Sequence, residues 1–321
     1  MHLGRRGFFK VSALAAGLAA LGGAPAAVEK RNVMPYRTLG KTGEKVSLLC
    51  VGGYHIGVGA LSDEESIRLQ RTAIDDGVNF LDNAYVYHNG RSEELMGKAL
   101  RDGYRDKVFL MTKHYSKERD AASAKRQLEE SLKRLQTGVI DLWQVHQIME
   151  AGHPTAVYAG GLLDVMTKAR EEGKIRYIGF TGHSRPEWHQ EMLDGGFDWD
   201  TVQMPINAFD HHWTSFQNSI MPQALEKNMG VIAMKTLGGS PGQFVNNAKI
   251  LTAEECLRYA MSLPVSTVVS GMDSMDKLKA NIATAKAFEP LEDEEVADIL
   301  ARCHDAAQGG QYEPYKEKTL A

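Results

Sequence analysis

The stretch NFLDNAYVYHNGRSEELMGKALRDGYRDKVFLMTK, residues 79–113, contains the pattern on which the fold depends. Two short apolar runs, which end at Asp82 and Lys113, flank a polar segment of helical character. Short apolar runs indicate buried β-strands, and a helical segment between two of them is typical of a strand–helix–strand unit with parallel strands. The stretch therefore predicts one βα repeat of an α/β fold.

The same unit recurs along the chain. Eight apolar, β-rich runs share the pattern, and they end near Gly52, Asp82, Lys113, His146, Thr181, Met204, Lys235 and Ser270. Successive ends lie 23 to 35 residues apart, and a closed barrel of eight βα units has about 31 residues per unit. An open doubly wound sheet is the alternative, but no G-x-G-x-x-G follows the first strand. We therefore predict a (β/α)8 TIM barrel.

Helical patterns fill the intervals between these strands. Leu128, Leu132 and Leu135 recur with helical spacing, and charged residues lie on the opposite face. Ser62 and Thr252 each precede a run of acidic residues, as expected where a helix begins with a capping oxygen and negative charge. These segments are therefore predicted to be amphipathic helices.

A β-hairpin is predicted in front of the first strand. The sequence LGKTG at Leu39–Gly43 has the composition of a tight turn, and its place in the chain favours a plug at the bottom of the barrel. No linker rich in Pro, Gly or Ser divides the chain after it. Residues 31–321 are therefore expected to form one domain.

Residues 1–30 have the composition of a signal peptide. Arg5 and Arg6 precede an apolar run at Val11–Leu21, and Ala24–Ala26 offers small residues at a cleavage point. The arginine pair resembles a twin-arginine signal. The apolar run is shorter than the roughly 20 residues that a membrane span needs, so no stable span is expected after cleavage. We predict export by the twin-arginine machinery, to the periplasm or otherwise out of the cytoplasm.

The overall composition excludes several classes of protein. Of 321 residues, 43% are hydrophobic and 24% are charged, which is ordinary for a globular protein. The formal net charge is −4 and no basic block occurs, so a nucleic-acid partner is not expected. Cys50, Cys256 and Cys303 form no C-x-x-C pair, so neither a disulfide framework nor a cysteine-rich metal site is indicated.

Chemistry in a (β/α)8 barrel lies where strands end and βα loops begin. Asp82, Lys113 and His146 each end a predicted strand, and Tyr87 lies five residues beyond Asp82. A strand-end carboxylate and ammonium pair across neighbouring strands, and the ammonium then favours phenolate and lowers the pKa of a neighbouring tyrosine. We therefore predict that Tyr87 is a proton donor and that His146 orients a carbonyl oxygen.

These residues carry a family resemblance. DNAYVY at Asp82–Tyr87, followed by GRSEELMGKAL at Gly90–Leu100, resembles the signature of the aldo-keto reductases. Lys113 and His146 are similar to the family's later motifs, and together the four residues match its Asp-Tyr-Lys-His tetrad. The resemblance implies an NAD(P)H-dependent aldo-keto reductase (EC 1.1.1.-). It would reduce an aldehyde or ketone, or oxidise the alcohol, with Tyr87 as general acid/base.

The resemblance also implies a nicotinamide cofactor, NADP or alternatively NAD, bound across the top of the barrel. It implies that the carboxamide binds Gln203, the adenine binds Asn281 and the 2′-phosphate faces Lys277. The full set assigned to the cofactor is Thr181, Gln203, Lys235, Leu237, Gly238, Lys277 and Asn281. Position alone predicts that the substrate pocket is lined by loop residues at the same end: Tyr54, His55, Tyr115, His211 and Trp213. No metal ligand is assigned.

The sequence departs from the family's pattern at the cofactor positions. Thr181-Gly182 replaces a Ser-Asn pair, and Met234-Lys235 replaces an aromatic residue with serine. Ala280 replaces a common acidic residue. Asp273 would repel the 2′-phosphate that Lys277 would attract, so the prediction leans to NADP and keeps NAD as the alternative.

Two other functions remain open from the sequence. A metal-dependent barrel hydrolase is suggested by histidines that follow successive strands: His55, His88, His114, His146, His183 and His211. The one tight pair among them is His211-His212, and neighbouring residues on a strand point to opposite sides, which disfavours chelation. The second alternative is a non-catalytic cofactor-sensing subunit, against which the complete set of four catalytic residues argues.

Overall fold

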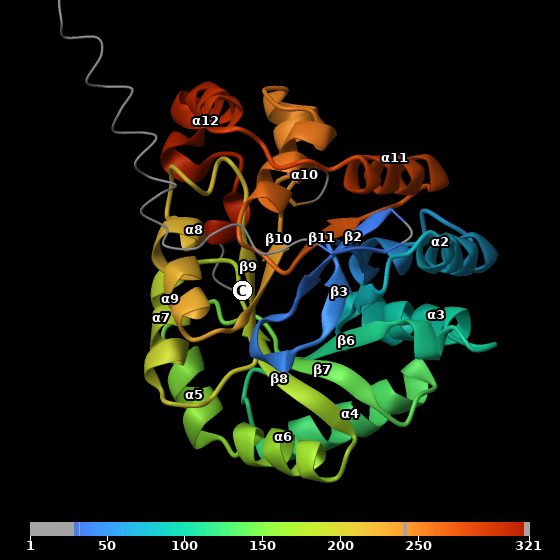
Figure 1. Cartoon of the computed structure of the whole chain (residues 1–321). Helices are drawn as coiled ribbons and strands as arrows, with labels where there is room; N and C mark the ends of the chain where they lie inside the picture. The colour runs from blue at the N-terminus through green and yellow to red at the C-terminus, as the bar shows by residue number, and fades with distance from the viewer. Residues whose placement is uncertain (1–28, 32, 240–242, 318–321) are drawn as a thin grey trace, which may run out of the picture.

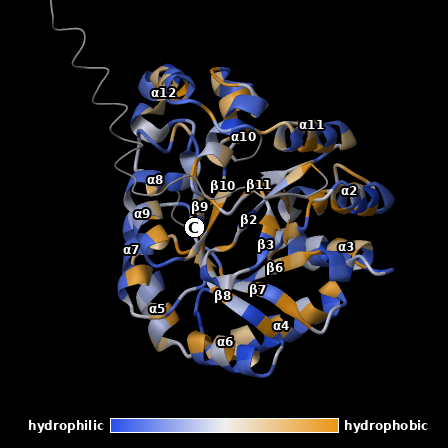
Figure 2. Ribbon diagram, in the orientation of Figure 1, coloured by the Kyte–Doolittle hydropathy of each residue, from blue (hydrophilic) through white to orange (hydrophobic). Residues whose placement is uncertain are grey.

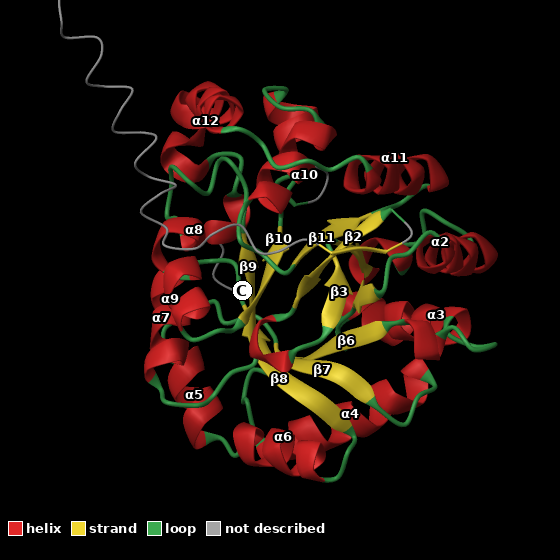
Figure 3. Ribbon diagram, in the orientation of Figure 1, coloured by secondary structure: helices red, strands yellow, loops and turns green. Residues whose placement is uncertain are grey.

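The computed structural model describes residues 29–31, 33–239 and 243–317. Eight parallel strands close into a barrel in the order β10–β11–β4–β5–β6–β7–β8–β9 (Figures 1 and 3). They are β4 (Leu49–Gly52), β5 (Phe80–Asp82), β6 (Phe109–His114), β7 (Ile140–Val145), β8 (Ile175–Thr181), β9 (Thr201–Pro205), β10 (Gly230–Met234) and β11 (Thr267–Gly271). The predicted (β/α)8 barrel is confirmed, and every predicted strand end is correct to within one residue.

Helices surround the barrel and carry hydrophobic and hydrophilic residues on different faces (Figure 2). The principal ones are α2 (Asp63–Asp75), α3 (Arg91–Ala99), α4 (Ala121–Leu135), α6 (Leu162–Glu171), α7 (Pro186–Asp194), α10 (Ala253–Ser262), α11 (Met275–Lys286) and α12 (Asp293–Ala307). Shorter ones are α5 (His153–Ala159), α8 (Phe216–Ser219) and α9 (Met221–Glu226). Ser62 and Thr252 begin α2 and α10 in capping boxes, as their sequence context predicts. In α4, Leu128 and Leu135 are buried.

The predicted hairpin is also present and closes the bottom of the barrel. Strands β2 (Met34–Thr38) and β3 (Lys45–Ser47) pair antiparallel, and β1 (Glu29–Arg31) adds a third strand. Lys41 at the turn donates its backbone N–H to the carbonyl of Asn228, just before β10 begins. Gly40 adopts φ +50, and a Cβ there would lie 2.3 Å from the backbone nitrogen of Gly230. Glycine is therefore required at this close approach.

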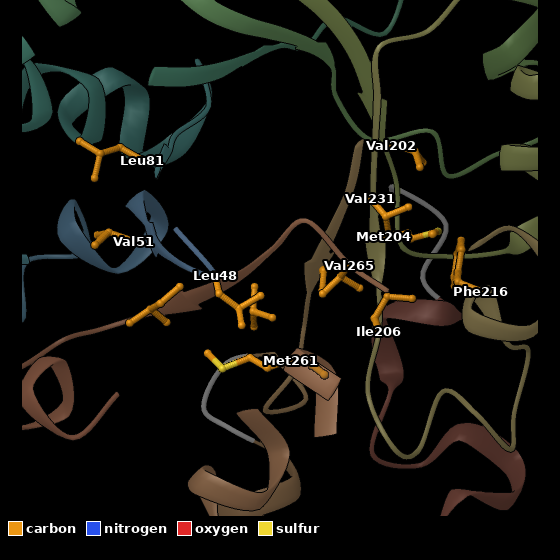
Figure 4. Packing of buried hydrophobic residues seen from close by; sticks show 14 of the residues in the cluster. Leu48, Val51, Leu81, Val202, Met204, Ile206, Phe216, Val231, Met261 and Val265 are labelled. Atoms are coloured by element: carbon orange, nitrogen blue, oxygen red, sulfur yellow. The ribbon is translucent and has the colours of Figure 1, made fainter. Parts of the chain in front are cut away.

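Two hydrophobic layers follow from the alternation of side chains along each strand. The inner layer fills the barrel and comprises Leu39, Val46, Cys50, Phe80, Phe109, Met111, Leu142 and Ile232. The outer layer lies between sheet and helices and includes Val51, Leu81, Val202 and Met204, which Figure 4 shows from close by. Leu39 and Val46 come from the hairpin region, so the hairpin completes the inner layer from below.

No helix among the described residues is long and apolar enough to cross a membrane. The predicted signal peptide falls almost wholly on residues 1–28, which lie outside the described residues. Its cleavage and its role in export therefore stay predictions.

Candidate active site

The site is built on a buried ion pair between two neighbouring strands. Asp82 ends β5 and Lys113 lies near the end of β6, and the Lys113 ammonium contacts the Asp82 carboxylate. The two side chains are 4% and 1% exposed. Lys113 Nζ also donates to the carbonyl oxygen of Asn83 at 2.8 Å. These contacts fix the ammonium in one place, which a buried charge requires.

Tyr87 lies beside this ion pair. Its hydroxyl oxygen is 3.5 Å from Lys113 Nζ, and the ammonium lies 5.1 Å from the centre of the phenol ring. The ring meets those of Tyr54 and His146 edge-on, at centroid distances of 5.3 and 5.8 Å. His88, the next residue, adopts φ +50 and turns the chain sharply after Tyr87. The predicted convergence of Asp82, Tyr87, Lys113 and His146 is therefore present in the geometry.

The acidity of Tyr87 differs from the expectation from sequence. Burial raises the pKa of Tyr87 above its ordinary value of 10, and the opposing effect of Lys113 is smaller. The expectation that Lys113 brings this pKa below its ordinary value is therefore wrong for the protein without ligand, because the sequence could not weigh burial against the cation. Tyr87 carries its proton throughout the neutral range, as a proton donor must.

His146 follows β7 and is held through its backbone. Its N–H donates to the carbonyl of His114, and its own carbonyl accepts from the buried guanidinium of Arg119. Burial, with a smaller contribution from Lys113, holds the pKa of His146 well below its usual 6.5. The imidazole is therefore neutral and presents one N–H donor and one acceptor. Its buried Nδ1 has no hydrogen-bond partner within the described part of the chain.

The ends of β8 to β10 offer groups that suit a nicotinamide. Thr181 and Gln203 are opposite each other in the β8–β9 ladder, and both are buried. The Gln203 amide nitrogen donates to Asp82 at 2.8 Å, so its oxygen must accept, and that buried oxygen finds no partner among the described residues. A carboxamide NH2 would satisfy it. The residues present therefore fit the cofactor.

Comparison with known proteins agrees with this geometry. The sequence profile of the Aldo/keto reductase family matches residues 48–247. The chain belongs to the aldo/keto reductase family. It is 31% identical over 216 residues to Aldo-keto reductase YhdN of Bacillus subtilis, and this match spans 64% of the chain but only 62% of YhdN. L-galactose dehydrogenase of Arabidopsis thaliana is 26% identical over 291 residues, which cover 79% of the chain and 89% of that enzyme.

Solved aldo/keto reductases have the same architecture. The holo form of AKR11C1 from Bacillus halodurans superposes with a TM-score of 0.70 at 25% identity, over 87% of the chain and 99% of that protein. An aldo/keto reductase from Klebsiella pneumoniae, solved in complex with NADP and acetate, gives 0.68 at 25% identity, over 83% and 94% of the two chains. The tetrad thus occurs in the fold that the family uses.

In this member of the aldo/keto reductase family, the residues predicted to bind the adenosine part of the cofactor already have partners within the protein. Asn281 is buried and donates to Ser270 Oγ at 3.0 Å. Lys277, which was expected to face a 2′-phosphate, pairs with Asp273 at 2.7 Å on the surface. Because Asp273 already neutralises Lys277, the two residues together give no strong preference between NADP and NAD. Leu237 packs against the outer core, and Gly238 adopts φ +86 beyond Lys235.

The predicted substrate residues divide into two groups. Tyr54 and Tyr115 lie at the site, since their rings face Tyr87 and His146 respectively. His55 packs against Gly271 at the end of β11.

Among the described residues, His211 and Trp213 make no hydrogen bond or ring contact with the four tetrad residues. His211 contacts Gln217 and His212, and Trp213 packs against Gly310. Where the structure is described, no three His, Cys, Asp or Glu side chains are grouped to hold a metal ion. The structure therefore lends no support to the barrel-hydrolase alternative.

Sequence reasoning missed a buried segment near the C-terminus. Glu313, Tyr315 and Lys316 are at most 8% exposed and pack onto the loops after β8, β9 and β10. Charged residues near the end of a chain are usually exposed to solvent, and no motif in the sequence indicates that these three residues are buried. Only the three-dimensional arrangement places them beside the site.

Proposed function

We propose that this protein is an NAD(P)H-dependent oxidoreductase that reduces an aldehyde or ketone, or oxidises the corresponding alcohol, with Tyr87 as the general acid/base. The observation that carries the proposal is the Tyr87 hydroxyl, 3.5 Å from the Lys113 ammonium within the buried pair with Asp82. Family membership and the NADP-bound relative from Klebsiella pneumoniae support it. The cofactor, when bound, supplies or accepts the hydride.

Residues of the chain itself transfer the proton and orient the substrate. The neutral imidazole of His146 donates a hydrogen bond to the carbonyl oxygen and so presents it to Tyr87. Tyr87 gives its proton to that oxygen as negative charge develops there. Lys113 stabilises the phenolate that remains, and Asp82 keeps the ammonium in position. In alcohol oxidation the same groups act in the opposite direction, and the Tyr87 phenolate accepts the proton of the alcohol.

We assign the nicotinamide end of the cofactor to Gln203 and Thr181, and its phosphates to the backbone around Lys235 and Gly238. The partnerless Gln203 oxygen supports the first assignment. The positive φ values of Lys235 and Gly238 support the second, because they form a tight turn directly after β10, in which Gly238 N–H donates to the carbonyl of Lys235. NADP is the cofactor named in the complexed relative, and NAD is the alternative.

Replacement of the acid tests the proposal. Tyr87→Phe is expected to lower kcat by about 10²- to 10⁴-fold, because the proton donor is lost. NADPH affinity should change less than about twofold, since the hydroxyl does not hold the cofactor. Tyr85→Phe is the matched control, because the Tyr85 hydroxyl bonds to Glu130 at 2.6 Å, outside the tetrad. Steady-state rates on an aldehyde panel and fluorescence titration with NADPH provide the two readouts.

The outcome also separates an enzyme from a cofactor sensor. Near-normal turnover in Tyr87→Phe rules out Tyr87 as the acid. NADPH binding without turnover on any aldehyde in the native protein favours the sensing subunit.

We further propose that residues 1–30 direct export of the folded protein through the twin-arginine route. Arg5 and Arg6, the apolar run and Ala24–Ala26 support this proposal. In a bacterium with a functional route, replacement of both arginines by lysine is expected to leave the protein in the cytoplasm. Immunoblots of periplasmic and cytoplasmic fractions report the location. Periplasmic protein in the double variant, or a cytoplasmic native chain, contradicts the proposal.

A further inference from the structure

The chain after α12 turns back to the barrel and packs onto the loops that follow β8, β9 and β10. We call Gly309–Lys316 the C-terminal clasp. His183, beyond β8, donates from Nδ1 to the backbone oxygen of Tyr315 at 3.2 Å. Asn207, beyond β9, donates to Glu313 at 3.2 Å and to the Tyr315 hydroxyl at 3.3 Å. The clasp is thus fastened to the loops at which the cofactor residues begin.

A buried network of charges anchors the clasp. Lys316 Nζ lies 2.7 Å from Asp210 and 2.9 Å from Glu313, and it donates to the carbonyl of Trp213 at 2.7 Å. The three charged side chains are at most 1% exposed. Burial raises the pKa of Asp210 and of Glu313, and Lys316 opposes that effect. A single cation therefore keeps two carboxyl groups inside the protein, and its removal would leave them unpaired.

Tyr315 reaches the cofactor positions themselves. Lys235 Nζ lies 5.4 Å from the centre of the Tyr315 ring, and the His183 ring meets it edge-on at 5.7 Å. A Cβ added to Gly239 would lie 3.7 Å from the same ring. The ring therefore lies against the Lys235 side chain and close to Gly239, with His183 of the β8 loop beside it.

The clasp covers this region without filling the nicotinamide contact. The Tyr315 hydroxyl is already satisfied by Glu313, at 2.7 Å, and by Asn207. The buried Gln203 oxygen still lacks a partner in the described structure, so no group of the clasp has taken the place of the carboxamide. Because the clasp lies over the site and leaves its polar contacts open, it is better suited to retain a bound ligand than to exclude one.

We propose that the C-terminal clasp is a wall of the cofactor site, that Tyr315 contacts the bound cofactor, and that the Asp210–Lys316–Glu313 network slows cofactor release. This inference rests on the proposed oxidoreductase function. It adds a segment that neither the tetrad nor the positions at the ends of β8 to β11 include. Release of the cofactor then requires the clasp to detach.

The test uses two variants of the full chain. Lys316→Met removes the buried cation at similar size, whereas Tyr315→Leu removes the ring and its hydrogen bond to Glu313 but keeps the ion pairs of Lys316 with Asp210 and Glu313. NADPH is chased by excess NADP⁺, and its dissociation rate is followed by stopped-flow fluorescence. Both variants are expected to release NADPH at least about tenfold faster, which corresponds to about 1.4 kcal/mol. Lys227→Met, at an exposed site before β10, is the matched control and should release NADPH at the native rate.

Limited proteolysis reports whether the clasp has detached. If Lys316→Met becomes cleavable within residues 309–317 but releases NADPH at the native rate, the proposal is wrong. It is equally wrong if NADPH binds the variants faster and more tightly, because the clasp then blocks the site. If Lys316→Met does not fold, Tyr315→Leu is a sufficient test by itself. An unchanged rate of NADPH dissociation in that variant overturns the proposal. Absence of binding of both NADPH and NADH in the native protein contradicts the proposed function instead, which keeps the two failures distinct.

Discussion

Asp82 links the two halves of the proposed chemistry. One carboxylate oxygen meets the Lys113 ammonium and the other accepts from the Gln203 amide. Lys113 acts on the phenol of Tyr87, whereas the Gln203 amide oxygen, which has no partner among the described residues, is the group that we assign to the cofactor. One side chain therefore fixes both the group that is proposed to control the proton and the group that is proposed to bind the nicotinamide.

The raised pKa of Tyr87 predicts different pH dependences for the two directions of the reaction. Reduction needs the protonated phenol, so its rate should stay flat through neutral pH and fall only as the pH approaches the raised pKa. Alcohol oxidation needs the phenolate, so its rate should rise about tenfold per pH unit below that pKa. His146 is already neutral, because its pKa is well below 6.5, and should add no step near pH 6.

Initial rates in both directions, from about pH 5 to pH 10, check this prediction. Lys113→Met provides the contrast, because loss of the cation raises the pKa of Tyr87 further and should depress oxidation most strongly. A reduction rate that declines between about pH 6 and pH 8 would show that the group in control is not Tyr87.

At the scale of elements, the strands and the capped helices were predictable. Strands of a parallel barrel are buried on both faces, so their sequences are apolar runs such as Gly230–Met234. Their ends are marked by charged residues that face the mouth, as Asp82 shows. Ser62 and Thr252 begin helices because each side chain accepts from a backbone N–H in the first turn. These signals are local, and the sequence contains them in full.

The rest depends on contacts between distant segments. Lys316 is buried because Asp210, 106 residues earlier in the chain, lies beside it. Lys277, in the first turn of α11, pairs with Asp273, which lies just before that helix begins, and the prediction of a phosphate contact did not include this pairing. The position of His211 in a top loop did not reveal that its ring turns to Gln217. Strand ends locate the site, but side-chain partners at the site follow from packing.

At the scale of the whole molecule, the two ends of the barrel have separate tasks. The tetrad and the C-terminal clasp lie at the carboxyl ends of the strands, and the hairpin closes the opposite end. In (β/α)8 barrels the first end carries chemistry and the second contributes stability. Arg37 of the hairpin reflects this role, since its buried guanidinium donates to the carbonyls of Met261, Leu263 and Val265.

Leu39→Ala tests this division. Leu39 is fully buried in the inner layer with Phe80 and Phe109, so the substitution leaves a cavity and should lower the free energy of unfolding by about 2–5 kcal/mol. The kcat/KM and NADPH affinity of the folded fraction should stay native, because the change lies at the end of the barrel opposite Tyr87.

Urea unfolding and steady-state kinetics on the same preparation measure the two effects. Val33→Ala is the control, since Val33 is 61% exposed just before the same hairpin and its truncation should not lower stability. Unchanged stability in Leu39→Ala would mean that the hairpin does not support the barrel. If Leu39→Ala remains folded but loses activity, the structural change at the hairpin must extend through the inner layer to the ion pair of Asp82 and Lys113.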